Sequence, residues 1–209
     1  MADDRSPDPG GRRPPGTEEF DALYEAGTPP WDIGRPQPAF ARLAEEGRLR
    51  GRVLDIGCGT GEHALLAAAA GLRAVGIDAA PAAIRLARAK ASERHLDARF
   101  EVADALDLGA MGAAFDTVLD SGLFHVFDDG DRARYVAGLR QVVVTGGSYL
   151  LLCFSDRQPG DWGPRRVGQD EIRAGFAQGW RVESIEATVM DITLGPEGAQ
   201  AWLAEITRA

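Results

Sequence analysis

One aspartate and three glycines form the run in this sequence whose types and spacing suit chemistry. The run consists of Asp55, Gly57, Gly59 and Gly61. A glycine-rich turn that leads from a strand into a helix lets a ligand approach bare backbone and face the helix N-terminus. The dinucleotide pattern with a third glycine at position 62 is broken, because that residue is Glu62. An acid at the strand end suits a ligand with an ammonium group and no pyrophosphate.

Two further aspartates follow apolar segments. Asp78 lies 17 residues after Gly61 and closes the second segment, and Asp104 follows the third. A carboxylate is a bidentate acceptor for a vicinal diol, so Asp78 suits ribose hydroxyls. Each aspartate has an alternative role as a capping or turn residue, and Asp107 is an alternative to Asp104.

The elements that must position these residues alternate along the chain. Strands are expected at 53–56, 74–78, 98–102, 115–120 and 148–154, and helices at 62–70, 80–94 and 129–144. This alternation predicts a parallel sheet covered on both faces. Further helices are expected from residue 17 and over 38–47 and 170–176, and a long strand over 180–190. The segment 201–207 fits either a strand or a helix.

Over residues 29–208 the chain resembles the class I, Rossmann-like methyltransferases that use S-adenosylmethionine. The resemblance implies an α/β fold: a doubly wound, mostly parallel Rossmann-like sheet with an antiparallel C-terminal strand and an N-terminal lid segment. In this family the glycine loop holds the methionine half of the cofactor, the acid after the second strand binds the ribose, and the acid after the third meets the adenine amino group. The expected cofactor-binding residues are Trp31, Asp55, Gly57, Cys58, Gly59, Asp78, Ala79, Asp104, Ala105, Asp120 and Ser121.

The proline-rich stretch 30–38 is similar to a segment of small-molecule methyltransferases of the thiopurine, halide and heterocyclic-toxin type. That group places this arm over the cofactor, with Trp31 against it. An aromatic face attracts a cationic sulfonium by ~1–2 kcal/mol when water is excluded. The alternative is that Trp31 only attaches the arm to the core. The resemblance implies that the acceptor is a small aromatic heterocycle or a phenol-like metabolite, methylated on O, N or S.

The segment after the fourth strand should border the transferring methyl, since ligands bind beyond the carboxyl ends of parallel strands. His125 in this segment is the candidate catalytic residue, as a base for an oxygen or nitrogen nucleophile. The alternative is a histidine packed between phenylalanines. For His63 a packing or polar contact is expected rather than catalysis. The residues expected to line the acceptor site are Phe20, Tyr24, Phe124, His125 and Trp162.

Length and charge exclude several function classes. The chain has 209 residues and a formal charge of 23 − 32 = −9, which disfavours nucleic acid as a partner. No apolar run approaches the ~20 residues of a membrane span, and no secretory signal is evident. Two cysteines, Cys58 and Cys153, are expected as free thiols in a reducing cytoplasm. No His/Cys cluster supports a metal site.

Three segments are expected: a disordered tail over 1–16, an N-terminal arm or lid over 17–48, and a methyltransferase domain over 49–209. The partner is a small-molecule methyl acceptor, and the oligomeric state stays open. Two alternative functions are an NAD(P)-dependent oxidoreductase and a non-catalytic cofactor-binding regulator.

Overall fold

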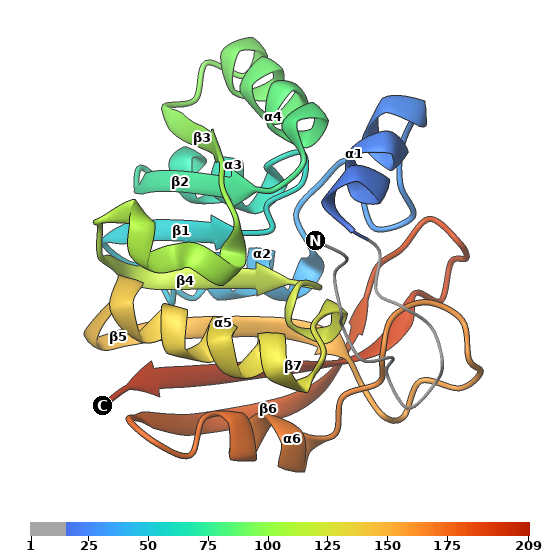
Figure 1. Ribbon diagram of the computed structural model, residues 1–209. Coiled ribbons are helices and arrows are strands. Elements are labelled where there is room, and N and C mark those ends of the chain that lie inside the picture. Colours follow the sequence, from blue (N-terminus) through green and yellow to red (C-terminus); the bar gives the residue numbers. More distant parts are fainter. Residues whose placement is uncertain (1–15) are drawn as a thin grey trace, which may run out of the picture.

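The computed structural model describes residues 16–209, which form a seven-stranded sheet in the order β3-β2-β1-β4-β5-β7-β6 (Figure 1). Every neighbouring pair is parallel except the two that β7 makes. The predicted fold class, with its antiparallel C-terminal strand, is confirmed. The strands are β1 (Arg52–Ile56), β2 (Arg73–Asp78), β3 (Ala98–Val102), β4 (Phe115–Ser121), β5 (Val143–Phe154), β6 (Trp180–Met190) and β7 (Ala199–Arg208).

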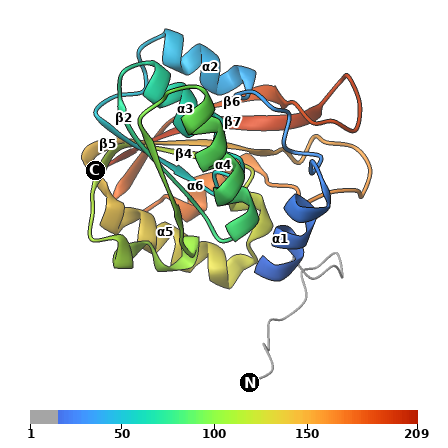
Figure 2. The same ribbon diagram turned by 90° about the horizontal axis from the view of Figure 1, so that it is seen from above.

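Helices cover both faces of the sheet, with α2, α3 and α4 on one and α5 on the other (Figure 2). The α-helices are α1 (Thr17–Ala26), α2 (Pro38–Glu45), α3 (Glu62–Ala69), α4 (Pro81–Glu93), α5 (Asp129–Val142) and α6 (Gln169–Gly175). Two 3-10 helices, η1 (Ala105–Met111) and η2 (Phe124–Val126), follow β3 and β4. Helix α5 begins at a side-chain cap, since Asp128 accepts the N–H of Asp131 at 2.8 Å.

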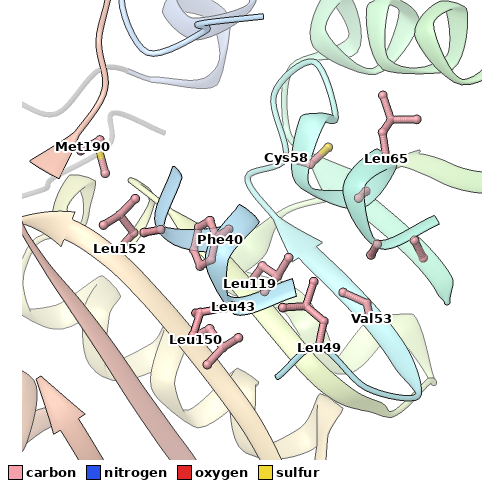
Figure 3. Packing of buried hydrophobic residues seen from close by; sticks show 14 of the residues in the cluster. Phe40, Leu43, Leu49, Val53, Cys58, Leu65, Leu119, Leu150, Leu152 and Met190 are labelled. Atoms are coloured by element: carbon pink, nitrogen blue, oxygen red, sulfur yellow. The ribbon is translucent and has the colours of Figure 1, made fainter. Parts of the chain in front are cut away.

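Two apolar clusters fill the space between the sheet and its helices. Along β5, Leu150 and Leu152 belong to the cluster under α2 and α3, whereas Leu151 and Cys153 belong to the cluster under α5. Figure 3 shows the first cluster, in which Phe40 of α2 lies among strand residues. Adjacent strand residues point to opposite faces of the sheet. This alternation also decides on which face each side chain lies at the carboxyl ends of the strands.

The C-terminal half departs from the expected boundaries. The helix expected to reach Val144 ends at Val142, because Val143 has extended backbone and pairs with Phe115 of β4. The ambiguous segment 201–207 is the core of β7, paired with β5 on one side and β6 on the other. Residues 201–204 are buried, which explains why their apolar pattern shows neither strand nor helix periodicity.

The tail predicted over residues 1–16 lies outside the described residues, apart from Gly16. Within residues 16–209, none of the helices combines the length and apolar character that crossing a lipid bilayer requires. The carboxyl ends of β1, β2 and β4 share one edge of the sheet, and Figure 1 shows α1 on that side. The candidate site is therefore sought at this edge.

Candidate functional site

The turn between β1 and α3, residues 57–61 and called here the glycine loop, requires glycine for its backbone. Gly57, Gly59 and Gly61 have φ of +64°, +51° and +87°, values that other residues rarely adopt. A Cβ on Gly59 would lie 2.6 Å from the hydroxyl oxygen of Tyr24. The loop therefore presents bare backbone to the space in which Tyr24 lies.

Asp78 lies directly beside this loop. Its Oδ2 accepts the N–H of Gly59 at 2.8 Å and its Oδ1 accepts the N–H of Ala80 at 2.9 Å. Burial raises the pKa of Asp78, and the backbone hydrogen bonds oppose that rise. The structure thus brings together Asp78 and the glycine loop, as their positions after adjacent parallel strands predict.

Asp55 has a carboxylate oxygen in need of a donor. Its Oδ2 accepts the N–H of Ala64 at 3.1 Å, whereas Oδ1 is one of three buried side-chain polar atoms without a hydrogen-bond partner among the described residues. Burial raises the pKa of Asp55 to about 7. An unsatisfied buried carboxylate oxygen beside a glycine loop fits a cationic donor, so the ammonium group of S-adenosylmethionine suits this position.

His63 links Asp55 to the arm. Its Nε2 accepts the backbone N–H of Gln37 at 3.1 Å, which leaves the proton of the neutral ring on Nδ1, 3.9 Å from Oδ1 of Asp55. Burial lowers the pKa of His63 to about 4, so the ring is neutral near pH 7. The expected polar contact is present.

An aromatic group from α1 and the arm lies over the glycine loop. The indole N–H of Trp31 donates to the hydroxyl of Tyr24 at 2.8 Å, and the ring of Phe20 meets that of Trp31 edge-on at 5.7 Å. Tyr24 was expected in the acceptor site, and the structure places its hydroxyl against Gly59 of the glycine loop. Its role in the acceptor site stays a prediction.

The proline-rich part of the predicted N-terminal segment, residues 28–38 and called the arm from here on, is attached to the glycine loop near its start and to the β6–β7 hairpin near its end. Near its start, Asp32 accepts the hydroxyl of Thr60 at 2.9 Å. Near its end, Gln37 donates to the carbonyl of Asp191 at 2.9 Å and accepts its N–H at 2.8 Å. Sequence reasoning missed Gln37, because nothing local to a proline-rich stretch shows that a distant hairpin will pair with it.

Glu62, which breaks the dinucleotide pattern, forms ion pairs next to the glycine loop. It accepts from Lys90 at 2.7 Å and from both terminal nitrogens of Arg94 at 2.8 and 2.9 Å. Lys90, the lone lysine of the sequence, also donates to Thr60 at 2.6 Å. These ion pairs connect α4 to the loop that α3 follows.

Two expected site residues face away from the ligand edge. Both carboxylate oxygens of Asp120 are occupied: Oδ1 by the N–H of Leu123 at 2.9 Å, and Oδ2 by the hydroxyls of Tyr135 and Tyr149 at 2.8 and 2.7 Å. Phe124 is fully buried in the cluster under α5, where it stacks on Phe176. Side-chain contacts of Asp120 with the cofactor and of Phe124 with the acceptor are thus corrected.

His125 has a fixed orientation that differs from that of a base. Its Nδ1 accepts the backbone N–H of Phe154 at 3.0 Å. The proton of the neutral ring therefore lies on Nε2. Burial and then the charges of Arg132 and Arg166 lower the pKa of His125 to about 3. The expectation of a base at Nε2 is corrected, since that nitrogen has no free lone pair.

Aromatic rings continue from His125 towards a cavity. Phe154 meets His125 edge-on at 5.1 Å and Trp162 edge-on at 5.6 Å. Trp162 lines a cavity of about 450 Å³, whose other walls belong to residues 192–198 of the β6–β7 hairpin. The lining of this cavity contains Trp162 but no residue of the glycine loop, and neither Phe20 nor Tyr24.

The remaining predicted residues contribute backbone or surface positions. Asp104 is exposed and caps η1, accepting the N–H of Leu106 at 2.8 Å through Oδ1. The thiol of Cys58 is buried in the cluster under α2 and α3, so only its backbone can face a ligand. Ala79, Ala105 and Ser121 follow or end β2, β3 and β4 at the ligand edge.

Comparisons with known proteins agree with this geometry. A family model described as "Methyltransferase domain" matches residues 53–147. The chain is 39% identical over 163 residues to 2-heptyl-1-hydroxyquinolin-4(1H)-one methyltransferase of Mycobacteroides abscessus, covering 77% of this chain and 72% of that protein. It is 28% identical over 184 residues to probable thiol methyltransferase 2 of Arabidopsis thaliana, covering 85% and 79%.

A solved structure is similar over nearly the whole chain. It comes from work on the conversion of a disulfide bond into a thioacetal group during echinomycin biosynthesis. It superposes with a TM-score of 0.83 at 40% identity and covers 92% of this chain and 93% of the other.

Proposed function

This chain belongs to the S-adenosylmethionine-dependent methyltransferases that act on small molecules, and on that basis we propose that its acceptor is an oxygen, nitrogen or sulfur atom of an aromatic heterocycle or phenol-like metabolite. The supporting observation is the row of rings from His125 through Phe154 to Trp162, which leads to the cavity beside the β6–β7 hairpin. Of these rings, Trp162 lines the cavity, and a flat aromatic acceptor matches such a wall.

The residues that would hold the cofactor surround the glycine loop. We infer that Gly57 and Gly59 let the methionine half approach the backbone, that Asp55 accepts from its ammonium group, and that Asp78 accepts from ribose hydroxyls. The free Oδ1 of Asp55 supports this arrangement. Asp104 caps η1 through Oδ1. Its second carboxylate oxygen, Oδ2, would accept from the adenine amino group.

The protein's contribution to the reaction is position and exclusion of water. When bound, S-adenosylmethionine supplies an electrophilic methyl carbon on a cationic sulfur. Trp31, oriented by Tyr24, offers an aromatic face close to the glycine loop, and such a face favours a cation. The hydrogen bond that Gln37 donates to Asp191 and the one that Asp32 accepts from Thr60 hold the arm over the loop.

The acceptor class also draws on the relatives. Their names specify a hydroxyquinolone and a thiol as the compounds on which those proteins act. In this chain, Trp162 is the ring at the cavity that an aromatic acceptor would contact, and Arg166 lies over both Trp162 and Phe154 at 5.6 and 5.3 Å.

A screen with isotopically labelled cofactor tests the proposal. Hydroxyquinolines, phenols and aromatic thiols should accept label, and their aliphatic analogues should not. Trp162→Ala should raise the KM of a productive aromatic acceptor by about two- to tenfold, because a stacking contact contributes ~0.5–1.5 kcal/mol, and should leave the Kd of S-adenosylhomocysteine unchanged. Trp162→Phe is the matched control and should retain most of the affinity. Equal turnover of aliphatic and aromatic acceptors contradicts the proposed class.

A further inference from the structure

The hydrogen bond between Phe154 and His125 decides which ring nitrogen carries the proton. A backbone N–H can only donate, so the lone pair that receives it at 3.0 Å is that of Nδ1. The opposite tautomer would set two donors against each other in a buried place, since His125 is 5% exposed and Phe154 is 3% exposed. The neutral ring therefore presents an N–H, and not a lone pair, at Nε2.

Nε2 points to the ligand edge of β4. It lies 3.4 Å from the position that a Cβ would occupy on Gly122, the residue that follows β4, and the terminal methyl of Met190 is 3.7 Å from that same position. In the same turn, Leu123 lies 3.2 Å from the Cβ position of Gly57. Within residues 16–209, no side chain or carbonyl accepts a hydrogen bond from Nε2. Nε2 is also not one of the fully buried polar atoms that lack a hydrogen-bond partner.

The positive charges near His125 favour an anionic ligand beside its Nε2. Arg132 of α5 and Arg166 of the loop after β5 both act on the ring. Arg132 is paired with Glu171 at 3.0 Å, whereas the Arg166 hydrogen bonds go to loop carbonyls. The nearby carboxylate of Asp120 directs its oxygens to Leu123, Tyr135 and Tyr149. Because burial and the charges of Arg132 and Arg166 lower its pKa, the ring stays neutral and keeps its donor at Nε2.

We propose that His125 donates a hydrogen bond from Nε2 to an acceptor atom that binds already ionised, so that the substrates of this enzyme are acidic hydroxyls and thiols. This inference rests on the proposed function, whose acceptor it narrows. The step balances without a protein base: a lone pair of the anionic acceptor forms the bond to the methyl carbon, the pair of the breaking carbon–sulfur bond stays on sulfur, and no proton moves. A neutral amine or weakly acidic alcohol would need a base, and the neutral ring of His125 offers no lone pair at Nε2.

The dependence of kcat/KM on pH distinguishes a hydrogen-bond donor at His125 from a general base at His125. For a series of phenols and thiols of graded acidity, kcat/KM should rise about tenfold per pH unit below the pKa of each acceptor and level off above it. The break should move with the acceptor. A break at one pH for every acceptor, lost in His125→Asn, would identify His125 as a base and overturn the inference.

Two variants separate the donor from the ring. His125→Asn keeps an acceptor for the Phe154 amide but removes the donor at Nε2, and should lower kcat by about a hundredfold, as loss of a donor to a charged oxygen does. His125→Gln places an amide nitrogen near the Nε2 position and should recover part of that loss on acidic acceptors. No recovery in His125→Gln, with equal losses in both variants on acceptors of every acidity, counts against a donor.

A measurement independent of turnover completes the test. The sequence has three histidines, so nitrogen-15 spectra can be assigned with His125→Asn. They should show His125 protonated at Nε2 and unprotonated at Nδ1 from pH 5 to 8. A ring protonated at Nδ1 overturns the inference whatever the acceptor screen shows. If the spectra are as expected but no acceptor is methylated, the proposed function fails while the assignment of the donor stands.

Discussion

At the scale of single residues, Asp55 connects ligand binding to pH. In the folded protein its carboxyl has a pKa of about 7, against an ordinary value of 3.8. Between these values the folded chain holds a proton that the unfolded chain has lost, so the contribution of Asp55 to the free energy of unfolding falls as pH rises through that window. Above pH 7 both states are ionised and the contribution is constant.

The same shift predicts a pH-dependent affinity for the cofactor. An ammonium group beside Oδ1 favours the ionised carboxylate, so binding below pH 7 must release a proton from Asp55. The Kd of S-adenosylhomocysteine should therefore improve by up to about tenfold per pH unit between pH 5.5 and 7, and then level off. Calorimetry in buffers of different ionisation enthalpy measures the released proton. Asp55→Asn should bind more weakly and without this slope; a slope that persists in the variant would contradict the assignment.

Residue-scale prediction from sequence succeeded where chain position alone decides the outcome. Gly59 and Asp78 meet because β1 and β2 are adjacent and parallel, and Asp55 lies near the same end of β1. It failed for Asp120, whose side chain shares the face of Val118 and so points to α5. It failed also for the role of His125, because the orientation of that ring is set by a backbone amide 29 residues away.

At the scale of elements, the arm joins two parts of the site. The side-chain amide of its Gln37 donates one hydrogen bond to the backbone of Asp191 and accepts another from it, although Asp191 lies 154 residues further along the chain. The backbone of Gln37 also donates to His63 of α3. Arm closure, the β6–β7 hairpin and the neighbourhood of Asp55 are thus connected through one residue.

Gln37→Ala should release the arm. The change leaves the partly buried N–H and carbonyl of Asp191 without these partners, which costs up to about 1–3 kcal/mol. We expect faster amide hydrogen exchange over residues 30–38, a lower free energy of unfolding and a higher KM for the acceptor. Arg35→Ala is the matched control, because it removes an exposed ion pair to the same Asp191 and should cost under about 1 kcal/mol. Similar exchange in both variants would contradict the role of Gln37.

Element boundaries were predictable where capping residues and periodicity agree. The strand over Trp180–Met190 and the start of α4 at Pro81 are confirmed. The direct passage from α5 into β5 at Val143 was not predicted, because a strand that starts without a loop leaves no turn signal. The anchoring of the arm depends on contacts between distant segments, which local patterns do not contain.

At the scale of the whole molecule, cofactor binding should raise thermal stability, because a ligand that binds only the folded state shifts the unfolding equilibrium. At 100 times its Kd, S-adenosylhomocysteine should add about 2.7 kcal/mol, which raises Tm by roughly 5–10 °C for a chain of this size. Thermal scanning at matched concentrations of NADH provides the control, with no shift expected. A shift with NADH alone would contradict the assigned cofactor.

The position of β7 has a consequence for how the chain folds. β7 follows β5 and β6 in sequence yet lies between them in the sheet. As the chain leaves the ribosome, the β5 edge that β7 pairs with and the whole of β6 therefore have no strand partner until residues 199–208 emerge. Late, non-local closure of this kind slows folding and exposes strand edges to self-association. Substitutions that weaken β7 should thus reduce soluble yield at synthesis more than they weaken the finished protein.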